Sequence, residues 1–463
     1  MATRGFSTRQ LHERDRASAP NARATPIYLT AGFEFDEYEA AAAHFNEGRG
    51  YAYSRIANPT VDAVEHTLAA LEGGSQALLL ASGQAATSVA LLALVESGQH
   101  LVSSTHIYEG TRGLFRDHFD RLGVATTFVD DIDDLDAWAA AIRPETRALF
   151  TESISNAANR LVDVAALADL AHRHGIPLVV DNTFGTPYLL RPIEHGADVV
   201  VHSASKFLAG HGSVLGGAIV DSGRFDAAAS GHLFPHLVAP GRGGLPSIVE
   251  RVGGDARIAY ARESVAPRFG PTPSPLNAFL IGQGIETLSL RVERQSANAL
   301  AVAQWLAGRP EVVAVDYVGL HSHPDHALAE RYLPGGFGSV FSFELRGGAE
   351  GARRFVEALE VFTHMTHLGD VRSLVLHPAS TSHAFLSDEE RASVGVAPGT
   401  LRLSIGIEDA ADLIDDLAQA LEAAAGAPET VSVPATAGVP ETAGVPETAG
   451  VPETAGVPET ASL

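Results

Sequence analysis

Two hydrophobic patterns alternate through the first half of the chain. Short apolar or β-branched runs occur at residues 77–80, 100–103, 126–129, 148–151, 178–180 and 199–201. Between them lie longer segments with helical periodicity, as at residues 61–71, 85–96 and 164–174. Continuous apolar strands that alternate with helices are typical of a parallel sheet buried on both faces. The pattern therefore predicts an α/β fold, with a mainly parallel sheet covered by helices.

The pattern changes after about Gly253. A long helical stretch covers residues 286–306, strand-like runs follow at 312–317 and 339–345, and an acidic-apolar helix covers 409–424. This order predicts a second, smaller α+β domain. We therefore expect an N-terminal arm at residues 1–60, a large domain at 61–253, a small C-terminal domain at 254–426 and a tail at 427–463.

The tail is repetitive. Four hexapeptides of sequence Ala-Gly-Val-Pro-Glu-Thr run from Ala437 to Thr460. A proline every six residues prevents a continuous helix or sheet ladder, and the apolar area is too small to offset chain entropy. We expect a disordered, weakly acidic extension; a solenoid is the alternative that a short repeat leaves open.

Charge and composition narrow the class of protein. A net charge of −24 and the lack of a basic stretch argue against a nucleic-acid surface. The first residues are charged and lack an apolar run, so we expect no signal peptide, and the sequence contains no run of about 18 apolar residues that could span a bilayer. With no cysteine, disulfides, thiolate catalysis and zinc-thiolate sites are excluded. We expect a cytoplasmic enzyme or binding protein.

Lys206 is the one lysine among the 32 lysines and arginines of the chain. Arginine can replace lysine as a solvated charge, but it cannot act as an amine that loses its proton and attacks a carbonyl. Lys206 also follows a buried strand and a hydroxyl-rich turn, and it precedes glycines, which is a poor place for a solubilising side chain. The retention of this lysine favours covalent catalysis over a chance survivor of biased codon usage.

A carboxylate and a glycine turn accompany Lys206 at predicted strand ends. Asp181 follows the preceding strand, and ligands of open α/β sheets bind at such ends. A lysine that forms an imine and an aspartate that keeps a ring nitrogen protonated fit pyridoxal phosphate (PLP); a turn cap is the alternative role for Asp181. Gly83 lies between a strand and a helix start that would hold a phosphate, while Ser203 and Ser205 supply hydroxyls.

Together these motifs resemble the Cys/Met-metabolism family of PLP-dependent enzymes, of fold type I. The resemblance covers residues 33–420 and rests on the following motifs in order: Tyr51 to Thr60, Ala81-Ser-Gly83, Tyr108, Glu152 to Asn156, Val180-Asp181, Val201 to Lys206, Ser373 to Thr381 and Leu401 to Ser404. Within the family the chain is most similar to the O-acetylhomoserine sulfhydrylases, on residues 275–291 and 377–386.

The resemblance implies a role for each site residue. Lys206 would bind the cofactor and shuttle protons, with Tyr108 as the second catalytic residue, stacked on the ring. The remaining cofactor contacts would be Asp181, Asn156, Gly83, Gln84, Ser203 and Ser205, joined by Tyr53 and Arg55 from a neighbouring subunit. Arg402 would clamp the substrate carboxylate, supported by Ser373. A homo-oligomer, most simply a tetramer with shared active sites, is therefore expected.

Three positions depart from the family pattern, and two histidine groups need an explanation. Ala157 replaces the usual proline after Asn156, and Glu109 replaces a glycine, where it could alter the entrance. Gly110 lies where methionine γ-lyases carry a cysteine, which disfavours that reaction.

The histidines at 321, 323 and 326, and those at 364 and 367, suggest a metal, but no acidic second shell is evident. We expect no metal, and a surface or core role for the second pair rather than substrate contact.

The implied reaction is γ-replacement, in which O-acetyl-L-homoserine and sulfide give L-homocysteine and acetate in methionine biosynthesis. Cystathionine γ-synthase, methionine γ-lyase and sulfhydrylases of O-succinylhomoserine or O-acetylserine use the same residues and remain alternatives. A PLP-binding protein without turnover, or an assembly protein recruited by its tail, is the non-enzymatic alternative. The intact set of Lys206, Asp181, Tyr108 and Arg402 argues against it.

Overall fold

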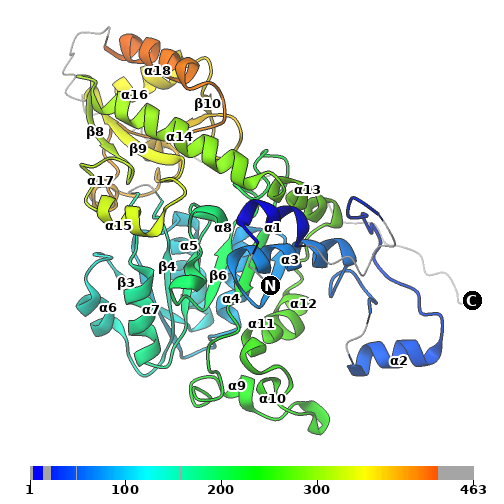
Figure 1. Ribbon diagram of the computed structural model, residues 1–463. Coiled ribbons are helices and arrows are strands. Elements are labelled where there is room, and N and C mark those ends of the chain that lie inside the picture. The colour runs from blue at the N-terminus through cyan, green and yellow to red at the C-terminus, as the bar shows by residue number, and fades with distance from the viewer. Residues whose placement is uncertain (1–3, 14–21, 48–49, 157–158, 426–463) are drawn as a thin grey trace, which may run out of the picture. The chain divides into compact units, whose positions relative to one another are not determined.

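The computed structural model describes residues 4–13, 22–47, 50–156 and 159–425, and Figure 1 follows the chain through them. The predicted repeat tail lies outside these residues. The helices are α1 (Phe6–His12), α2 (Tyr38–Glu47), α3 (Pro59–Glu72), α4 (Gly83–Leu92), α5 (Glu109–Gly113), α6 (Leu135–Ala141), α7 (Val164–Arg173), α8 (Thr186–Leu189), α9 (Pro235–Val238), α10 (Ile248–Val252), α11 (Ala256–Tyr260), α12 (Ala266–Phe269), α13 (Pro275–Ile285), α14 (Leu288–Ala307), α15 (His326–Tyr332), α16 (Gly348–Ala358), α17 (Asp388–Ser393) and α18 (Ala410–Ala425). Within the described residues, no helix has both the length and the apolar composition needed to cross a membrane.

A seven-stranded sheet forms the centre of the first half, in the order β1-β7-β6-β5-β4-β2-β3. Its strands are β1 (Gln76–Leu80), β2 (His100–Ser104), β3 (Ala125–Val129), β4 (Thr146–Glu152), β5 (Leu178–Asp181), β6 (Val199–His202) and β7 (Gly217–Asp221). Neighbouring strands from β6 to β3 are parallel, while β7 pairs antiparallel with β1 and β6. The predicted α/β fold with a mainly parallel sheet is confirmed; the sequence pattern did not predict β7.

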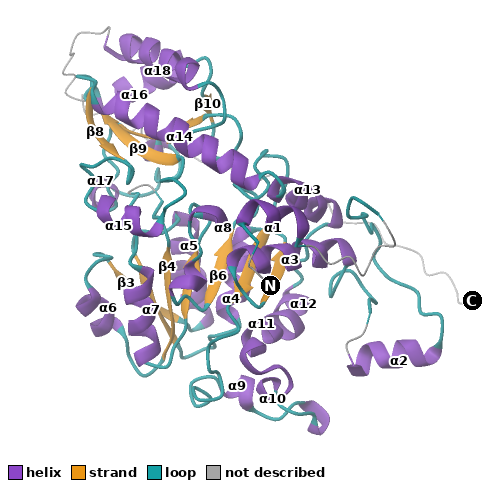
Figure 2. Cartoon of the chain, viewed as in Figure 1, coloured by secondary structure: helices purple, strands orange, loops and turns teal. Residues whose placement is uncertain are grey.

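Helices cover both faces of this sheet, as Figure 2 shows. One face packs with α3 and α7 in a core that includes Leu68 and Leu167, and the other packs with α4 and α11 around Leu91 and Ile258. Both faces are therefore apolar, which explains the continuous hydrophobic runs of the strands.

A five-stranded sheet follows in the order β10-β11-β12-β9-β8. Its strands are β8 (Val312–Asp316), β9 (Val340–Leu345), β10 (Thr363–His364), β11 (Leu374–Leu376) and β12 (Thr400–Ser404). A separate core joins it to α14, α16 and α18. The smaller α+β part is confirmed, although β10, β11 and β12 were not predicted; β10 and β11 have only two and three residues.

The helices that follow Gly253 do not all belong to this second sheet. α11 contacts β7 and β1, and α13 packs on α3. Residues as far as Ile285 therefore pack with the first sheet, beyond the boundary expected at Gly253. α14 leads from there to the second sheet, which it contacts at β8.

Candidate active site

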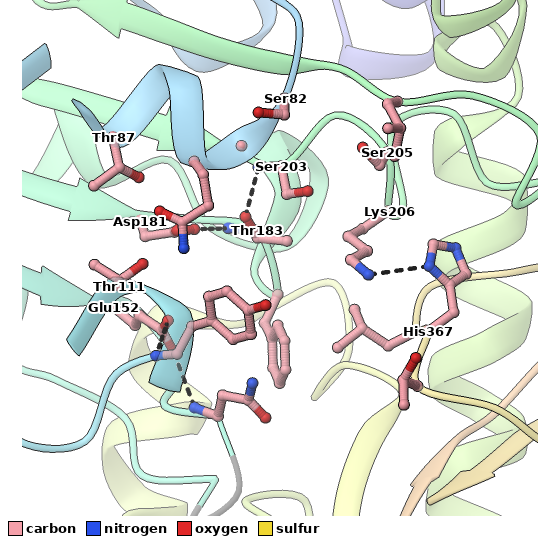
Figure 3. Close-up of a pocket in the computed structure, with 18 of the residues that line it drawn as sticks. Ser82, Thr87, Thr111, Glu152, Asp181, Thr183, Ser203, Ser205, Lys206 and His367 are labelled. Carbon is pink, nitrogen blue, oxygen red and sulfur yellow. Dashed lines mark hydrogen bonds between the residues drawn. The ribbon is translucent and has the colours of Figure 1, made fainter. Parts of the chain in front are cut away.

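A cavity of about 500 Å³ opens where β4, β5 and β6 end and α4 begins. Residues 365–368 and Arg402, from the part of the chain that forms the second sheet, line it from the other side. Figure 3 shows polar side chains from both sides directed toward one another. The strand ends of an open α/β sheet are where ligands bind, so the topology explains the position of the cavity.

Lys206 reaches into this cavity from the turn after β6, where its backbone N–H donates to the Ser203 carbonyl at 3.1 Å. The Nζ atom lies 3.0 Å from Nδ1 of His367 (Figure 3). Burial, and then the charge of Arg402, lowers the pKa of Lys206 to about 8. Burial, and then the charge of Lys206, lowers the pKa of His367 to about 4, so near neutral pH the imidazole is an uncharged acceptor for the amine. Lys206 is therefore an amine that can lose its proton close to neutral pH.

Asp181 and Glu152 lie side by side at the ends of β5 and β4, where they are register partners. Asp181 accepts a hydrogen bond from the Thr183 N–H at 2.9 Å. Burial raises the pKa of Asp181, and burial together with the charge of Asp181 raises the pKa of Glu152 well above its usual range. Two carboxyl groups on one wall form an acidic end that suits a protonated ring nitrogen.

Arg402 supplies the cationic end of the cavity. It projects from β12 and is only 6% exposed. Its Nη1 donates to Asn156 Oδ1 at 3.1 Å, and its Nη2 donates to the His367 carbonyl at 3.4 Å. The described contacts include no carboxylate partner for this buried guanidinium. A buried arginine held by neutral groups is suited to a carboxylate that arrives with a substrate.

The start of α4 forms a tight cradle with the turn after β6. Ser82 caps α4 by accepting from the Ala85 N–H at 3.2 Å, which leaves Gly83 and Gln84 at the first helical positions. A Cβ on Gly83 would lie 2.8 Å from Cβ of Ser203, so only glycine fits this approach. Gln84 Oε1 is buried without a hydrogen-bond partner in the described structure. The Ser205 hydroxyl lines the cavity but also donates to the Gly216 carbonyl at 3.2 Å.

These groups fit PLP. A helix N-terminus with a glycine that leaves room for close approach suits the phosphate, Asp181 suits the ring nitrogen, and an amine with a lowered pKa suits the aldehyde carbon. Tyr108 and Asn156 line the same cavity, so the structure brings together eight of the predicted cofactor residues: Lys206, Asp181, Asn156, Gly83, Gln84, Ser203, Ser205 and Tyr108.

Tyr53, Arg55 and Ser373 are not among the residues that line the cavity. The Arg55 guanidinium lies 5.3 Å from the Tyr53 ring centroid and donates to the Pro267 carbonyl at 2.6 Å. Ser373 is fully buried, and its hydroxyl donates to Glu408 Oε2 at 2.9 Å. The hydroxyl of Ser373 is therefore paired with Glu408 outside the cavity lining.

The structure shows the surroundings of two of the three residues that depart from the family pattern. Glu109 is buried beside Tyr108 and lies 3.5 Å from Nε of Arg112, outside the cavity lining. A Cβ on Gly110 would lie 2.4 Å from Cε1 of the Tyr108 ring. Position 110 therefore has no space for a larger side chain unless Tyr108 moves. Ala157 lies outside the described residues.

The predicted histidine groups have separate roles. His323 pairs with Asp316 at 3.1 Å, and His326 Nδ1 donates to the Val318 carbonyl at 2.8 Å. In the part of the chain that the structure describes, no three His, Cys, Asp or Glu side chains gather in a group that could hold a metal. His364 is exposed in β10, whereas His367 lines the cavity and contacts Lys206. The expected surface or core role is therefore wrong for His367, because a loop brings it over the sheet.

Sequence reasoning missed Glu152, Thr183 and His367 as site residues. Glu152 and Thr183 could have been found, since each lies at or just after a strand end, as Asp181 does. The sequence offered no such signal for His367, which precedes β11 in a loop.

Comparisons with known proteins connect the chain to PLP-dependent enzymes. Residues 7–422 match the family described as Cys/Met metabolism PLP-dependent enzymes. The chain is 43% identical to a homocysteine synthase of Schizosaccharomyces pombe, over 90% of this chain and 98% of that protein. It is 42% identical to an O-acetyl-L-homoserine sulfhydrylase of Corynebacterium glutamicum, over 89% of this chain and 96% of the other. A crystal structure from Campylobacter jejuni, described as an O-acetylhomoserine (thiol)-lyase with a pyridoxyl-lysine phosphate, superposes with a TM-score of 0.86 at 35% identity, over 90% of this chain and 99% of that chain.

Proposed function

Because the chain belongs to the Cys/Met metabolism family of PLP-dependent enzymes, we propose that it converts O-acetyl-L-homoserine and sulfide to L-homocysteine and acetate. The observation that carries the proposal is the cavity that joins the Lys206 amine, the Asp181 carboxylate and the Arg402 guanidinium. These are the groups that a PLP reaction of an amino acid requires. Relatives more than 40% identical over about nine-tenths of the chain are named for this reaction or its product.

The proposed roles combine the family resemblance with the position of these residues in one cavity. Lys206 would bind the cofactor covalently, and Asp181 would pair with its ring nitrogen. Tyr108 would contact the ring, Asn156 the ring oxygen, and Arg402 the substrate carboxylate. The phosphate would be bound by Gly83, Gln84, Ser203 and Ser205, which line the same cavity. We retain no substrate role for Ser373, whose hydroxyl is bonded to Glu408.

Bound PLP supplies an electron sink for the bond electrons released at the substrate Cα. Lys206, with a pKa of about 8, is partly unprotonated near neutral pH and can take the proton from Cα. Lys206 would pass this proton to C4′ of the cofactor, which frees the amine to remove a proton from Cβ so that acetate can leave from Cγ. After sulfide has added at Cγ, Lys206 would return the proton to Cβ, recover the one on C4′ and deliver it to Cα. Arg402 holds the carboxylate throughout, so that Cα and Cβ stay within reach of one amine.

Replacement competes with elimination, in which the same substrate is released as 2-oxobutyrate. The lyase cysteine implied by the resemblance has no counterpart here, and Gly110 is packed against Tyr108 and Gln84 with no space for a thiol. This packing favours replacement by sulfide.

The test compares two reactions at matched substrate concentrations. O-acetylhomoserine with sulfide should give homocysteine much faster than methionine gives 2-oxobutyrate and methanethiol. O-succinylhomoserine and O-acetylserine serve as competing acyl substrates. A methionine-cleaving rate equal to or above the sulfhydrylation rate would overturn the proposal in favour of a lyase.

We also propose that the enzyme is a homo-oligomer with shared active sites, most simply a tetramer. Tyr53 is 46% exposed, and the nearby arm leaves Leu29 and Tyr38 75% and 85% exposed, which is unusual for large apolar side chains and favours burial against a second copy. Tyr53 and Arg55 could then reach the phosphate of a partner.

Mixed oligomers of inactive Arg55→Ala and inactive Lys206→Ala subunits should recover activity, whereas verified hybrids that stay inactive would exclude sharing. A cytoplasmic location remains a prediction of the sequence.

A further inference from the structure

Glu152 has no role in the proposed reaction, yet it is the most constrained acidic side chain in the cavity wall. It ends β4, is 6% exposed and lines the cavity. Its Oε1 accepts from the Tyr108 backbone N–H at 2.7 Å, and its Oε2 accepts from the Asn156 backbone N–H at 3.0 Å. Figure 3 shows both bonds running from this one carboxyl group.

We propose that Glu152 is a positioning residue, which holds Tyr108 and Asn156 against the cofactor ring because the two oxygens of one carboxyl group accept from both backbone N–H groups. The proposal rests on the ring contacts given to Tyr108 and Asn156 under the proposed function. Glu152 itself touches neither the substrate nor the reacting atoms in this role.

The local structure explains why a side chain is needed here. Tyr108 is the residue before α5, and its side chain makes no capping hydrogen bond. Asn156 lies in the loop after β4, two residues beyond the isolated bridge between Ile154 and Leu161. Neither N–H donates within a strand ladder, and a buried N–H without an acceptor is costly. One carboxylate satisfies both donors and therefore couples two loops that are distant in sequence.

The same carboxylate fixes the loops relative to the sheet. Glu152 on β4 is in register with Asp181 on β5. The carboxyl group that accepts from both loops therefore lies on the strand next to the one that carries Asp181, the residue proposed to pair with the ring nitrogen. Arg402 further donates to Asn156 Oδ1 at 3.1 Å. The ring face, ring oxygen and ring nitrogen contacts are thus connected through Glu152 to one strand pair.

A purely structural role is the competing explanation, and the chain contains a matched control. Asp416 is 5% exposed and accepts from the backbone N–H groups of Glu360, Val361 and Phe362 at 2.8, 2.9 and 3.1 Å. It is not among the residues that line the cavity. Both carboxylates order backbone turns, but only Glu152 orders residues of the site.

The experiment compares Glu152→Gln with Asp416→Asn in the full-length holoenzyme. The glutamine has nearly the same shape but only one acceptor oxygen, so its NH₂ group opposes one of the two N–H donors. Glu152→Gln should change the visible absorbance and induced circular dichroism of the bound cofactor, weaken cofactor affinity about tenfold (roughly one hydrogen bond) and lower kcat more than it changes KM. Asp416→Asn should lower the melting temperature and leave all three cofactor readouts within twofold of wild type.

A variant-free measurement keeps the proposal falsifiable if Glu152→Gln does not fold. Hydrogen exchange of wild-type enzyme should show protected amides at Tyr108 and Asn156, both with and without cofactor. Rapid exchange at these amides, or a folded Glu152→Gln enzyme with unchanged cofactor signals, would overturn the proposal. If wild type binds the cofactor but makes no homocysteine while the Glu152→Gln signals still change, the proposed reaction fails and the positioning role stands.

Discussion

The sheet side of the cavity and the side opposite differ in how their functional groups converge. On the sheet side, Asp181, Glu152 and Lys206 follow adjacent parallel strands, so sheet pairing alone brings them together. On the opposite side, Arg402 projects from β12, while His367 comes from the loop before β11. The difference shows that residues at the ends of neighbouring parallel strands lie close together whenever the sheet forms. The position of a residue in a loop of the second sheet does not follow from the strand order.

Ser373 and His367 lie in one loop and show that its contacts could not be inferred from the sequence. The resemblance suggested Ser373 as a support for the substrate carboxylate, yet its hydroxyl donates to Glu408 and Ser373 is not among the residues that line the cavity. His367, six positions earlier, received no site role and lies 3.0 Å from the Lys206 amine. Three predictions test the contrast between the two sides, and a fourth concerns the repeat tail.

Loss of Lys206 on the sheet side should have the largest effect. Lys206→Ala should reduce homocysteine formation by about 10⁴-fold or more, since it removes both the covalent link and the proton carrier. Borohydride treatment of wild type should label the one tryptic peptide that contains Lys206, because the chain has no other lysine. Lys206→Arg is the control, since it keeps the charge without a reactive amine; label found only at the N-terminal amine would contradict the assignment.

Arg402 on the opposite side should matter for binding more than for chemistry. Arg402→Lys loses the two-pronged grip on the carboxylate, and we expect KM for O-acetylhomoserine to rise about 10- to 100-fold, as for loss of a hydrogen bond to a charged group. Steady-state kinetics measure it. Arg372→Lys is the matched control, because this neighbouring arginine is paired with Asp370 and its side chain is 66% exposed. Equal effects at both positions would refute a specific role for Arg402.

The contact between the two sides predicts a pH dependence. His367 accepts from the Lys206 amine, and this bond stabilises the protonated form, so His367→Leu should lower the pKa of Lys206 further below its ordinary value. Capture of PLP by apoenzyme should quicken as pH rises through about 8 in wild type and at lower pH in the variant, because only the free amine attacks. The exposed His364→Leu is the control. An unshifted profile, or one displaced upward, would contradict the contact.

The smallest effect should come from the repeat. A chain that ends at Ala427 lacks all four hexapeptides and should keep its turnover and melting temperature, because a proline-rich repeat offers little apolar area for packing. Activity assays, thermal unfolding and the mass of the oligomer together measure this. A smaller oligomer or a loss of activity would show that the repeat docks.

The sequence by itself determined the parallel α/β sheet and its six predicted strands, and its local pattern identified Lys206, Asp181 and Gly83 as site candidates, whereas Arg402 came from the family resemblance; all four line the cavity. Buried strands, polar residues at strand ends and a single lysine can each be recognised from a short stretch of sequence. Only the tertiary structure decided that β7 enters the sheet antiparallel, that residues after Gly253 pack with the first sheet, and that Glu152 binds two loops. The hydrogen bonds of His367 with Lys206 and of Ser373 with Glu408 were likewise visible only in the tertiary structure. These outcomes depend on contacts between segments distant in sequence, and the energy of such contacts leaves no local pattern along the chain.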